Sequence, residues 1–224
     1  MCRLFVRPMY QKAFSLRNGR RYMRRRELIR VSAFAGVGIL TGCLNSGNGD
    51  SSEVPEPVDL SGDKFDDQGG MAIGDHGGPN GQIFYRNNSP EGRDNPAWFH
   101  TLVFGLFPYH FERLDRGWEA EIIYVTDYSA VELSLPENEE RPNLPSPTAP
   151  ETFADATELT YVAESTARGG MGPALPPFSD EDEAAEFADE YGGRTVGFDD
   201  IDRRFIESLR LNAPGGGMNM GNEG

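Results

Sequence analysis

The sequence predicts an α+β fold of two small ββαβ-type units, at residues 65–135 and 151–211. Runs typical of strands alternate with amphipathic stretches, and a segment with five prolines, 136–150, separates two such groups. The tripeptide Gly69-Gly70-Met71 recurs as Gly169-Gly170-Met171, and a similar order of elements follows each copy. A chain of 224 residues is long enough for two small cores.

Charge is divided very unevenly along the chain. Residues 1–42 hold ten of the 21 Lys and Arg residues and one of the 36 acidic residues, so the remainder has 11 basic against 35 acidic side chains. A nucleic-acid-binding surface needs clustered basic side chains, so this class of partner is excluded. Lys64 is the only lysine after residue 42. An acidic surface so poor in lysine fits a protein that is kept soluble in strong salt, which predicts a halophilic source.

The amino-terminal segment has the pattern of an export signal. Residues 24–30 are rich in arginine, the apolar run 31–40 is too short to span a membrane, and Cys43 follows. Arg25-Arg26 resembles a twin-arginine signal, and Leu40-Thr41-Gly42-Cys43 resembles a lipobox. We therefore interpret 1–43 as a lipoprotein signal, with 23–43 its true extent and Cys43 the lipidated residue. The alternative is a short membrane-touching helix with an incidental cysteine.

Residues 44–64 are polar and contain Val-Pro-Glu-Pro, which predicts a flexible linker from the membrane. One acyl chain binds a membrane only marginally, so we expect more than one on Cys43. The second cysteine, Cys2, also precedes the globular part, which excludes a disulfide framework there.

In the first unit, residues 82–85 are β-like and end in a turn at 87–90. Residues 97–107 carry Trp98, Leu102 and Leu106 at helical spacing, which predicts a helix that breaks at Pro108. The β-branched and aromatic run 121–126 predicts a strand.

The proline-rich segment 136–150 is interpreted as a linker or an ordered extended arm. In the second unit, Ser179 is the expected N-cap of an acidic helix that ends at Gly192-Gly193. Its expected buried face consists of Ala184, Ala185, Phe187 and Ala188. The remaining expectations are strands at 159–163 and 194–198, a terminal helix at 201–211 and a disordered Gly/Met tail at 212–224.

Enzyme motifs give no support for catalysis. The globular part has no cysteine for a nucleophile or a thiolate zinc site, and it has no Gly-x-Ser-x-Gly elbow, phosphate loop or dinucleotide fingerprint. The three histidines are His76, His100 and His110, and the break at Pro108 keeps the last two from sharing one helix face. Surface or hydrogen-bonded helix histidines are the favoured interpretation of His100 and His110.

The positions of the methionines indicate a candidate metal site more clearly than those of the histidines do. Beyond position 23 it occurs only at Met71, Met171, Met218 and Met220, each among glycines and outside any periodic core stretch. A thioether is a soft ligand that favours Cu(I), and glycines let two distant thioethers approach one ion. Gap-filling beside a tight turn is an equally supported alternative for Met71 and Met171. The tail sequence Met218-Asn219-Met220 resembles a Met-x-Met copper motif only weakly.

Several motifs together resemble the NosL family of nitrous oxide reductase accessory lipoproteins. They are Asp67-Gln68-Gly69-Gly70-Met71, Gly77-Gly78-Pro79-Asn80-Gly81-Gln82-Ile83-Phe84, Tyr124-Val125-Thr126-Asp127-Tyr128, Gly170-Met171-Gly172-Pro173, Pro177-Phe178-Ser179, and the run 184–198. The resemblance covers about residues 64–202, in the family's order.

The resemblance implies a Cu(I)-binding chaperone on the extracytoplasmic side of the cell membrane, with nitrous oxide reductase and an accessory ABC transporter complex as partners. The implied fold is two homologous ββαβ units related to organomercury lyase, without that enzyme's activity because its cysteines are missing. Many members carry Cys-x-x-Cys-Gly-Met where this chain has Asp66, Gly69 and Met71. Met71 and Met171 are the implied ligands, and Asp67 and His76 are candidates to complete the shell.

Three functions follow as hypotheses. The preferred one is a copper chaperone without catalytic activity, anchored through Cys43 after twin-arginine export. The second is a docking subunit of the maturation or transporter complex that holds no metal of its own, which the missing cysteines favour. The third, an extracytoplasmic hydrolase, is disfavoured because no nucleophile is evident.

Overall fold

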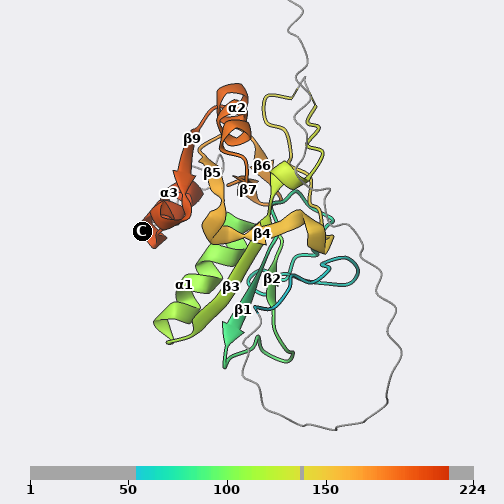
Figure 1. Cartoon of the computed structure of the whole chain (residues 1–224), viewed down its shortest axis with the longest axis vertical. Coiled ribbons are helices and arrows are strands. Elements are labelled where there is room, and N and C mark those ends of the chain that lie inside the picture. Colours follow the sequence, from blue (N-terminus) through green and yellow to red (C-terminus); the bar gives the residue numbers. More distant parts are fainter. Residues whose placement is uncertain (1–53, 137–138, 212–224) are drawn as a thin grey trace, which may run out of the picture. The chain divides into compact units, whose positions relative to one another are not determined.

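In the computed structural model, which describes residues 54–136 and 139–211, two antiparallel sheets form the framework (Figure 1). The first has the order β2-β1-β3-β4 and the second the order β8-β5-β9. In both, the first strand of the unit is central and its two neighbours are separated in sequence by a helix. The bounds are β1 Gly81–Arg86, β2 Ala97–Phe99, β3 Glu119–Thr126, β4 Phe153–Asp155, β5 Thr160–Ala163, β8 Pro177–Phe178 and β9 Arg194–Gly197.

Three α-helices and several single turns complete the elements. The helices are α1 Phe107–Asp115, α2 Glu181–Tyr191 and α3 Arg203–Leu211. A π-helical turn, η1 Leu102–Leu106, runs directly into α1, and the 3-10 turns are η2 Tyr128–Ala130, η3 Pro150–Thr152, η4 Ala156–Glu158 and η5 Phe198–Asp200. A short hairpin joins β6 (Arg168–Gly169) to β7 (Gly172–Pro173).

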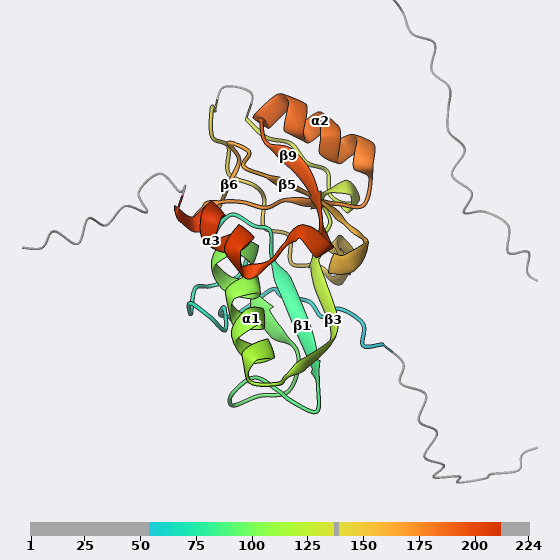
Figure 2. The same cartoon turned by 90° about the vertical axis from the view of Figure 1, so that its left-hand side faces the viewer.

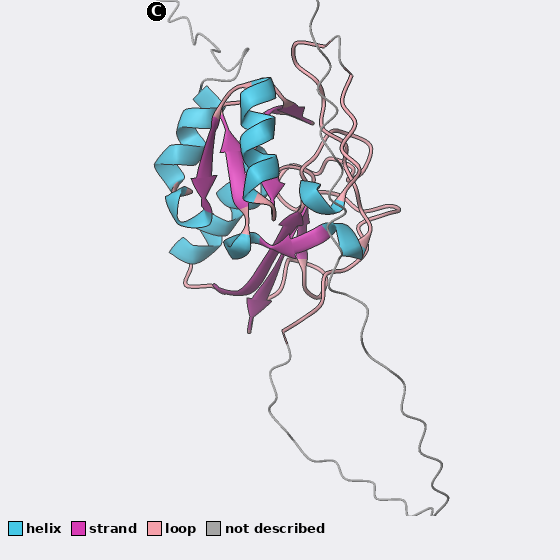
Figure 3. Ribbon diagram, turned by 45° about the horizontal axis from the view of Figure 1, so that its top comes forward, coloured by secondary structure: helices cyan, strands magenta, loops and turns pink. Residues whose placement is uncertain are grey.

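The largest core is shared by both sheets, so the described residues fold as one body. Ile83 and Phe99 of the first sheet lie in the same buried cluster as Tyr161 of the second and Ile206 of α3. Figure 2 shows α1 lying along β1 and β3, with α3 beside it. The second sheet is covered on both faces, because Tyr161 of β5 packs with Ile206 of α3 and the neighbouring Val162 packs with Phe187 of α2. Figure 3 shows strands of this sheet lying between helices.

Strand β1 is buried on both faces because the chain covers both. Leu102 and Leu106 pack on one face, and the segment 58–73 contributes Leu60 and Ile73 to a second cluster with Trp98 and Tyr124. The buried amide of Gln82 is paired through both its oxygen and its nitrogen, since it accepts from the backbone N–H of Val58 and donates to the Val58 carbonyl.

This packing corrects the expected flexible linker at 44–64. Leu60 is fully buried, and its N–H donates to the carbonyl of Thr148 at 2.8 Å, so residues 58–60 belong to the folded body. The proline-rich segment corresponds to the extended arm. Leu144 is buried, its N–H donates to the Arg168 carbonyl, and Asn80 Nδ2 donates to the Pro147 carbonyl.

The expected helix at 97–107 with a break at Pro108 is wrong. Residues 97–99 form an edge strand, because Trp98 and Phe99 are good β-formers that pair with Gln82 and Gly81. The helix instead starts at Leu102 and continues through Pro108, which occupies the first turn of α1, where an α-helix leaves its N–H groups without partners.

Two details of α2 also differ from expectation. Asp180 rather than Ser179 is the N-cap, because its carboxylate accepts from the N–H groups of Asp182 and Glu183. Ala184 and Phe187 are buried, but Ala185 faces solvent. The remaining expected strands and helices, including β3, β5, β9 and α3, are confirmed within a few residues.

Candidate functional site

Three segments meet at His100, directly after β2: two that follow one another before β1, and one about 70 residues after His100. The first is a loop closed by the bridge between Phe65 and Ala72. The second is the segment that carries His76, and the third is the turn between β6 and β7. The N–H of Gly170, in that turn, donates to the Gly77 carbonyl at 2.7 Å. The fold therefore collects both Gly-Gly-Met tripeptides around one buried imidazole.

Asp66 fixes the position of this imidazole. One carboxylate oxygen, Oδ2, accepts from the backbone N–H of His100 at 2.9 Å and from its Nδ1 at 2.7 Å. The other oxygen accepts from the N–H groups of Gln68 and Gly69. Burial opposes ionisation, but the hydrogen bonds from His100 and Gly69 outweigh it and lower the pKa of Asp66. Asp66 is therefore ionised and acts only as a hydrogen-bond acceptor, for the 68–69 backbone and for His100.

The π-helical turn η1 makes room for Asp66. A Cβ on Gly105 would lie 2.7 Å from Asp66 Oδ2, closer than real Cβ contacts. Glycine at this position lets the carboxylate approach the helix backbone closely. Such π-helical turns occur frequently at functional sites.

His100 presents one unused nitrogen. Since ionised Asp66 can only accept, Nδ1 of His100 carries a proton, and in the neutral imidazole Nε2 then has a free lone pair. The side chain is 1% exposed, and Nε2 has no hydrogen-bond partner among the described residues. A buried polar atom without a partner needs an explanation. A histidine that donates through one nitrogen to a carboxylate and offers the other is the usual arrangement of a metal ligand.

His76 adds a second imidazole beside the first. The two rings meet edge to face, with centroids 6.3 Å apart and an interplanar angle of 68°. A Cβ on Gly170 would lie 2.8 Å from His76 Cβ and 3.2 Å from His100 Cδ2, so the turn packs directly on both side chains. Unlike His100, His76 is exposed and lines an open depression of about 530 Å³ together with Asp75 and Arg168.

Both expected methionines lie in loops that contact this pair. Met171 follows Gly170 at the tip of the β6–β7 turn and is 48% exposed. Met71 is partly buried, and its carbonyl accepts from the N–H of Asp66 at 2.8 Å. The backbone of Met71 is therefore hydrogen-bonded to Asp66. The residue before Met171, Gly170, packs against His76 and His100.

Asp67, the other expected member of the shell, is engaged elsewhere. Its Oδ2 forms an ion pair with Arg93 and accepts from the N–H of Trp98 at 2.8 Å. Burial raises the pKa of Asp67, although Trp98 and Arg93 act in the opposite direction. Both bonds use Oδ2, so a ligand role for Asp67 would fall to Oδ1 of a carboxylate that Arg93 and Trp98 hold in place.

His110 belongs to the core. It lies in α1, stacks on Tyr85 and has its Nδ1 3.5 Å from the Tyr85 hydroxyl. Burial lowers the pKa of His110 to about 4, so it is neutral near pH 7. The interpretation as a helix histidine was therefore right for His110.

For His100 the favoured interpretation was wrong. His100 is neither on the surface nor in a helix, because the residues before it, to which helical spacing was assigned, form β2. The available signal was Trp98-Phe99, a β-forming pair directly before a histidine.

The paired imidazoles are the only nitrogen donors that the described residues bring together at this place. Within residues 54–136 and 139–211, no three His, Cys, Asp or Glu side chains form a group that could hold a metal ion. A metal at the two imidazoles would need further donors, and Met71 and Met171 are carried by the loops that pack around them. Thioethers select Cu(I), whereas hard cations require oxygen ligands.

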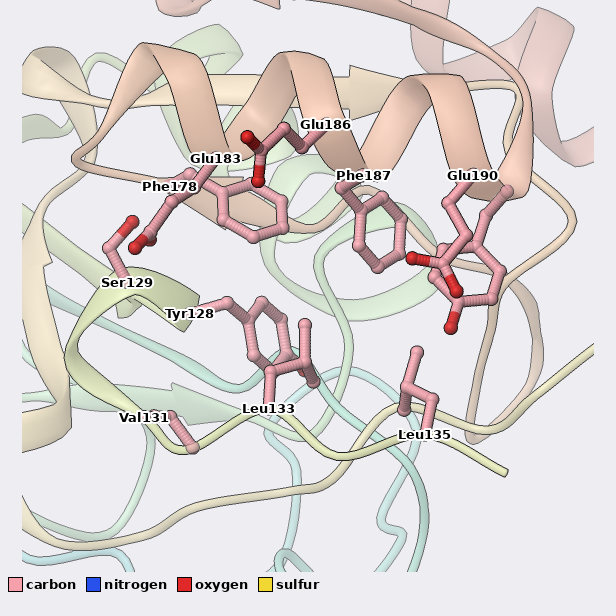
Figure 4. Close-up of a pocket in the computed structure, with 11 residues that line it drawn as sticks. Tyr128, Ser129, Val131, Leu133, Leu135, Phe178, Glu183, Glu186, Phe187 and Glu190 are labelled. Carbon is pink, nitrogen blue, oxygen red and sulfur yellow. The ribbon is translucent and has the colours of Figure 1, made fainter. Parts of the chain in front are cut away.

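A separate hollow lies between α2 and the segment 128–135 (Figure 4). Its floor contains Phe178, Phe187 and Leu133, and its rim carries glutamates of α2. None of its lining residues is a histidine, cysteine or methionine. The Ser129 hydroxyl accepts from the N–H of Asp180, and Tyr128 and Tyr191 bring two further hydroxyl groups to the lining. The hollow provides exposed carboxylates rather than soft donors.

Some expected features fall outside the described residues. These are the signal and Cys43, and the tail with Met218 and Met220. Among the helices that the structure describes, none combines the length and apolar character needed to cross a membrane.

Comparisons with known proteins give one consistent match. A family model named NosL matches residues 57–206. The copper-binding lipoprotein NosL of Stutzerimonas stutzeri is 34% identical over 62 residues, which is 28% of this chain and 33% of that protein. The match thus spans about a third of that relative's length. The crystal structure of the copper chaperone NosL from Shewanella denitrificans matches with a TM-score of 0.52 and 21% identity, covering 67% of this chain and 98% of that one. This structural likeness shows that the α+β fold is the same.

Proposed function

Since the chain belongs to the NosL family, we propose that it is a copper-binding chaperone that holds Cu(I) and has no catalytic activity. The observation that carries the proposal is the buried Nε2 of His100, which has no hydrogen-bond partner among the described residues. Asp66 supports the proposal, because its hydrogen bond holds the proton on Nδ1 and leaves Nε2 available to a metal. The name of the Stutzerimonas relative supports the choice of copper.

The ligands we propose are His100, Met71 and Met171, with His76 as a fourth donor. Imidazole binds several transition metals, but thioethers add a preference for Cu(I) over Zn(II), which favours thiolate and imidazole. Outside the cytoplasm a thiolate is easily oxidised, whereas this set contains none. Asp67 remains a weaker candidate, because Arg93 and Trp98 hold one oxygen of its carboxylate.

The exposure of the donors suits transfer. His100 is buried, but His76 and Met171 are exposed at the surface, so a partner could displace them first. We propose nitrous oxide reductase as the recipient and an accessory ABC transporter complex as a further partner. The location we propose is the extracytoplasmic face of the cell membrane, reached by twin-arginine export and held through lipid on Cys43.

Cu(I) competition against a chromophoric chelator tests the site. The full chain would carry Cys2→Ser and Cys43→Ser, so that no thiolate contributes, and would be measured anaerobically in high salt with reductant. We expect one equivalent bound, and an affinity reduced at least 10- to 100-fold in the Met71→Leu, Met171→Leu variant and in His100→Gln. The matched control His110→Gln should bind as the parent does.

The two variants protect the test against a folding artefact. His100→Gln removes the partner of a buried carboxylate and could destabilise the fold, whereas the methionine changes lie on loops. Thermal unfolding of each variant identifies such a loss. Parental affinity in the folded methionine variant would overturn the site assignment.

A docking subunit without its own metal is the second candidate. The observation that favours it is that Asp66 and Gly69 stand where the family resemblance places two cysteines, and Asp66 is committed to hydrogen bonds. Two results would support this candidate. The protein would co-purify with the transporter to the same extent with and without a copper chelator, and it would bind no Cu(I) in the competition above.

A further inference from the structure

An apolar hollow with two arginines at its edge lies between the β6–β7 hairpin and α3. It has a volume of about 390 Å³, and its lining includes Pro173 and Leu209 together with Arg141 and Arg168. The N–H of Arg168 donates to the carbonyl of Pro142 at 2.9 Å, so the segments that carry the two arginines lie side by side. The hollow therefore combines apolar walls with two guanidinium groups.

The chain does not neutralise these two arginines. Six of the ten arginines after residue 42 form ion pairs with Asp or Glu, but Arg141 and Arg168 form none within the described part of the chain. Glu164, which also lines the hollow, lies 3.6 Å from Arg194 instead. In a region with 35 carboxylates, two unpaired arginines at one hollow form a distinct cationic surface. Such a surface complements an anionic ligand.

Arg168 connects this hollow with the proposed copper site. It also lines the open depression that contains His76. It pairs with Pro173 across the hairpin whose tip carries the half-exposed Met171. Because only three residues separate Arg168 from Met171 along the chain, their Cα atoms are at most about 11 Å apart. A group held at the hollow is therefore close to the two exposed donors.

The chemistry of the surface favours a protein segment over an anionic lipid. Guanidinium groups bind carboxylates through paired N–H···O bonds, and arginine is enriched at the core of protein interfaces. Cu(I) leaves one set of soft donors for another, and protein side chains provide such donors whereas lipid headgroups do not. Strong salt screens repulsion between two acidic proteins beyond about 3 Å, so short contacts of this kind decide where they dock.

We propose that this hollow is the docking surface for the protein that receives the copper, and that it binds an acidic segment of that protein. An apolar side chain of the segment enters the hollow, and carboxylates on either side of it pair with Arg141 and Arg168. The recipient's own ligands then replace Met171 and His76 on Cu(I), with no change in oxidation state. This inference rests on the proposed copper site and names the surface beside which that site is emptied.

Peptide binding tests the surface without copper. The probe is the peptide acetyl-Gly-Asp-Leu-Glu-Gly-amide, and its neutral counterpart has Asn and Gln in place of Asp and Glu. Titrated into the full chain with Cys2→Ser and Cys43→Ser, at the lowest NaCl concentration that keeps it folded, the acidic peptide should shift the Leu209 methyl resonances saturably. We expect at least tenfold weaker binding of the neutral peptide, and of the acidic peptide to Arg141→Gln, Arg168→Gln. The arginine-rich amino-terminal segment is the same in every variant, and Leu209 reports on the hollow itself.

Copper transfer tests the role of the surface. Two acceptor peptides carry the same Cys-Gly-Gly-Cys sequence after either the acidic or the neutral probe, so copper–thiolate absorbance reports the acceptor alone. From the chain loaded with one equivalent of Cu(I), the acidic acceptor should take copper at least tenfold faster. Arg141→Gln, Arg168→Gln should remove this advantage but keep the parental Cu(I) affinity in the chelator competition.

The matched control is Arg86→Gln, Arg116→Gln. It removes the same charge from two exposed arginines at the ends of β1 and α1, whose ion pairs are also exposed and contribute little to stability. This variant should keep the advantage of the acidic acceptor. Loss of the advantage in both variants would show that net charge, rather than the hollow, sets the transfer rate, and would overturn the inference.

The remaining outcomes separate the two proposals. If neither Leu209 nor the transfer rate distinguishes the two peptides while Cu(I) binds as proposed, the docking inference fails and the copper site stands. If vesicles of phosphatidylglycerol, but not of phosphatidylcholine, shift Leu209 through the same arginines and the acidic peptide does not, the hollow is a lipid site and the inference fails. If the chain binds no Cu(I), the proposed function fails, and this inference fails with it.

Discussion

At His100 a single hydrogen bond decides which nitrogen is available. Asp66 accepts from Nδ1, and this leaves Nε2 as the only ring position for a metal. Aspartate at 66 also satisfies the backbone N–H groups of Gln68 and Gly69. The residue at this position thus shapes the 65–72 loop and the imidazole together, without being a ligand in this arrangement.

We expect Asp66→Asn to weaken Cu(I) binding by about 10- to 100-fold. An amide can present an N–H where Oδ2 accepts two bonds, which favours the tautomer with the proton on Nε2 and blocks the proposed ligand atom. The buried mismatch should also cost about 1–3 kcal/mol of unfolding free energy. Nitrogen-15 histidine spectra report the tautomer, and the chelator competition reports the affinity.

Asp67→Asn is the matched control for this change. Asp67 is the neighbouring carboxylate, but it contacts Arg93 and Trp98 rather than a histidine. We expect the variant to lose stability while keeping the affinity and the His100 tautomer. Equal losses of affinity in both variants would contradict a positioning role specific to Asp66.

Stability between pH 6.5 and 4 should depend on His110. Because burial lowers the folded pKa of His110 from 6.5 to about 4, the unfolded chain binds a proton in this range and the folded chain does not. The contribution of His110 is present above pH 6.5 and is lost as the pH falls toward 4, by about 3 kcal/mol. Urea unfolding at several pH values measures the slope, and His110→Gln should remove it. An unchanged slope would disprove this assignment.

At the scale of elements, the acidic helix α2 allows a direct test of its N-cap. We expect Asp180→Ala to reduce the unfolding free energy by about 1 kcal/mol, since the Asp180 carboxylate accepts from Asp182 and Glu183. Ser179→Ala should change it by less than about 0.5 kcal/mol, because no capping bond is made by that side chain. Urea unfolding distinguishes the two. A larger loss of stability in Ser179→Ala than in Asp180→Ala would show that Ser179 is the N-cap, as the sequence predicts.

The sequence was sufficient for elements whose local pattern agrees with their tertiary role. Strand β3 is β-branched and aromatic, and α2 has an acidic first turn and Gly192-Gly193 at its end. It was insufficient at 97–108, where Trp98, Leu102 and Leu106 have helical spacing but lie in two different elements. Pairing with β1 overrides the spacing at Trp98, and no local rule signals that competition.

At the scale of the whole molecule, the repeat in sequence and the repeat in topology do not coincide. Strands β1 and β5 hold equivalent central places in their sheets. However, Gly69-Gly70-Met71 precedes β1, whereas Gly169-Gly170-Met171 follows β5. The tripeptide therefore marks the two loops that meet at His100 rather than the start of each unit.

The sequence pointed to the methionines of the candidate site but not to its Asp66–His100 pair. Methionines among glycines stand out in a linear sequence because they break the usual pattern of core filling. The bond between Asp66 and His100 joins residues 34 positions apart, and it depends on β2 lying beside β1. Only tertiary structure shows that His100 is buried with one nitrogen unpaired.

The charge of the whole chain predicts how its stability depends on salt. Residues 43–224 carry 35 acidic and 11 basic side chains, so the folded state repels itself at low ionic strength. The Debye length falls from about 10 Å at 0.1 M to about 3 Å at 1 M, which screens this repulsion. We expect the thermal midpoint to rise by several degrees over this range of NaCl concentration.

A local variant tests whether repulsion between carboxylates is the cause. Glu183, Glu186 and Glu190 line one side of the hollow in Figure 4, and none of them forms an ion pair within the described residues. Changing all three to Gln should raise the midpoint at 0.1 M NaCl and shrink the further gain at 1 M, because fewer like charges remain to be screened. Sucrose stabilises by exclusion from the surface without screening, so it should raise parent and variant equally. A salt gain that is the same in both chains would show that NaCl acts through hydration of the surface instead of through charge.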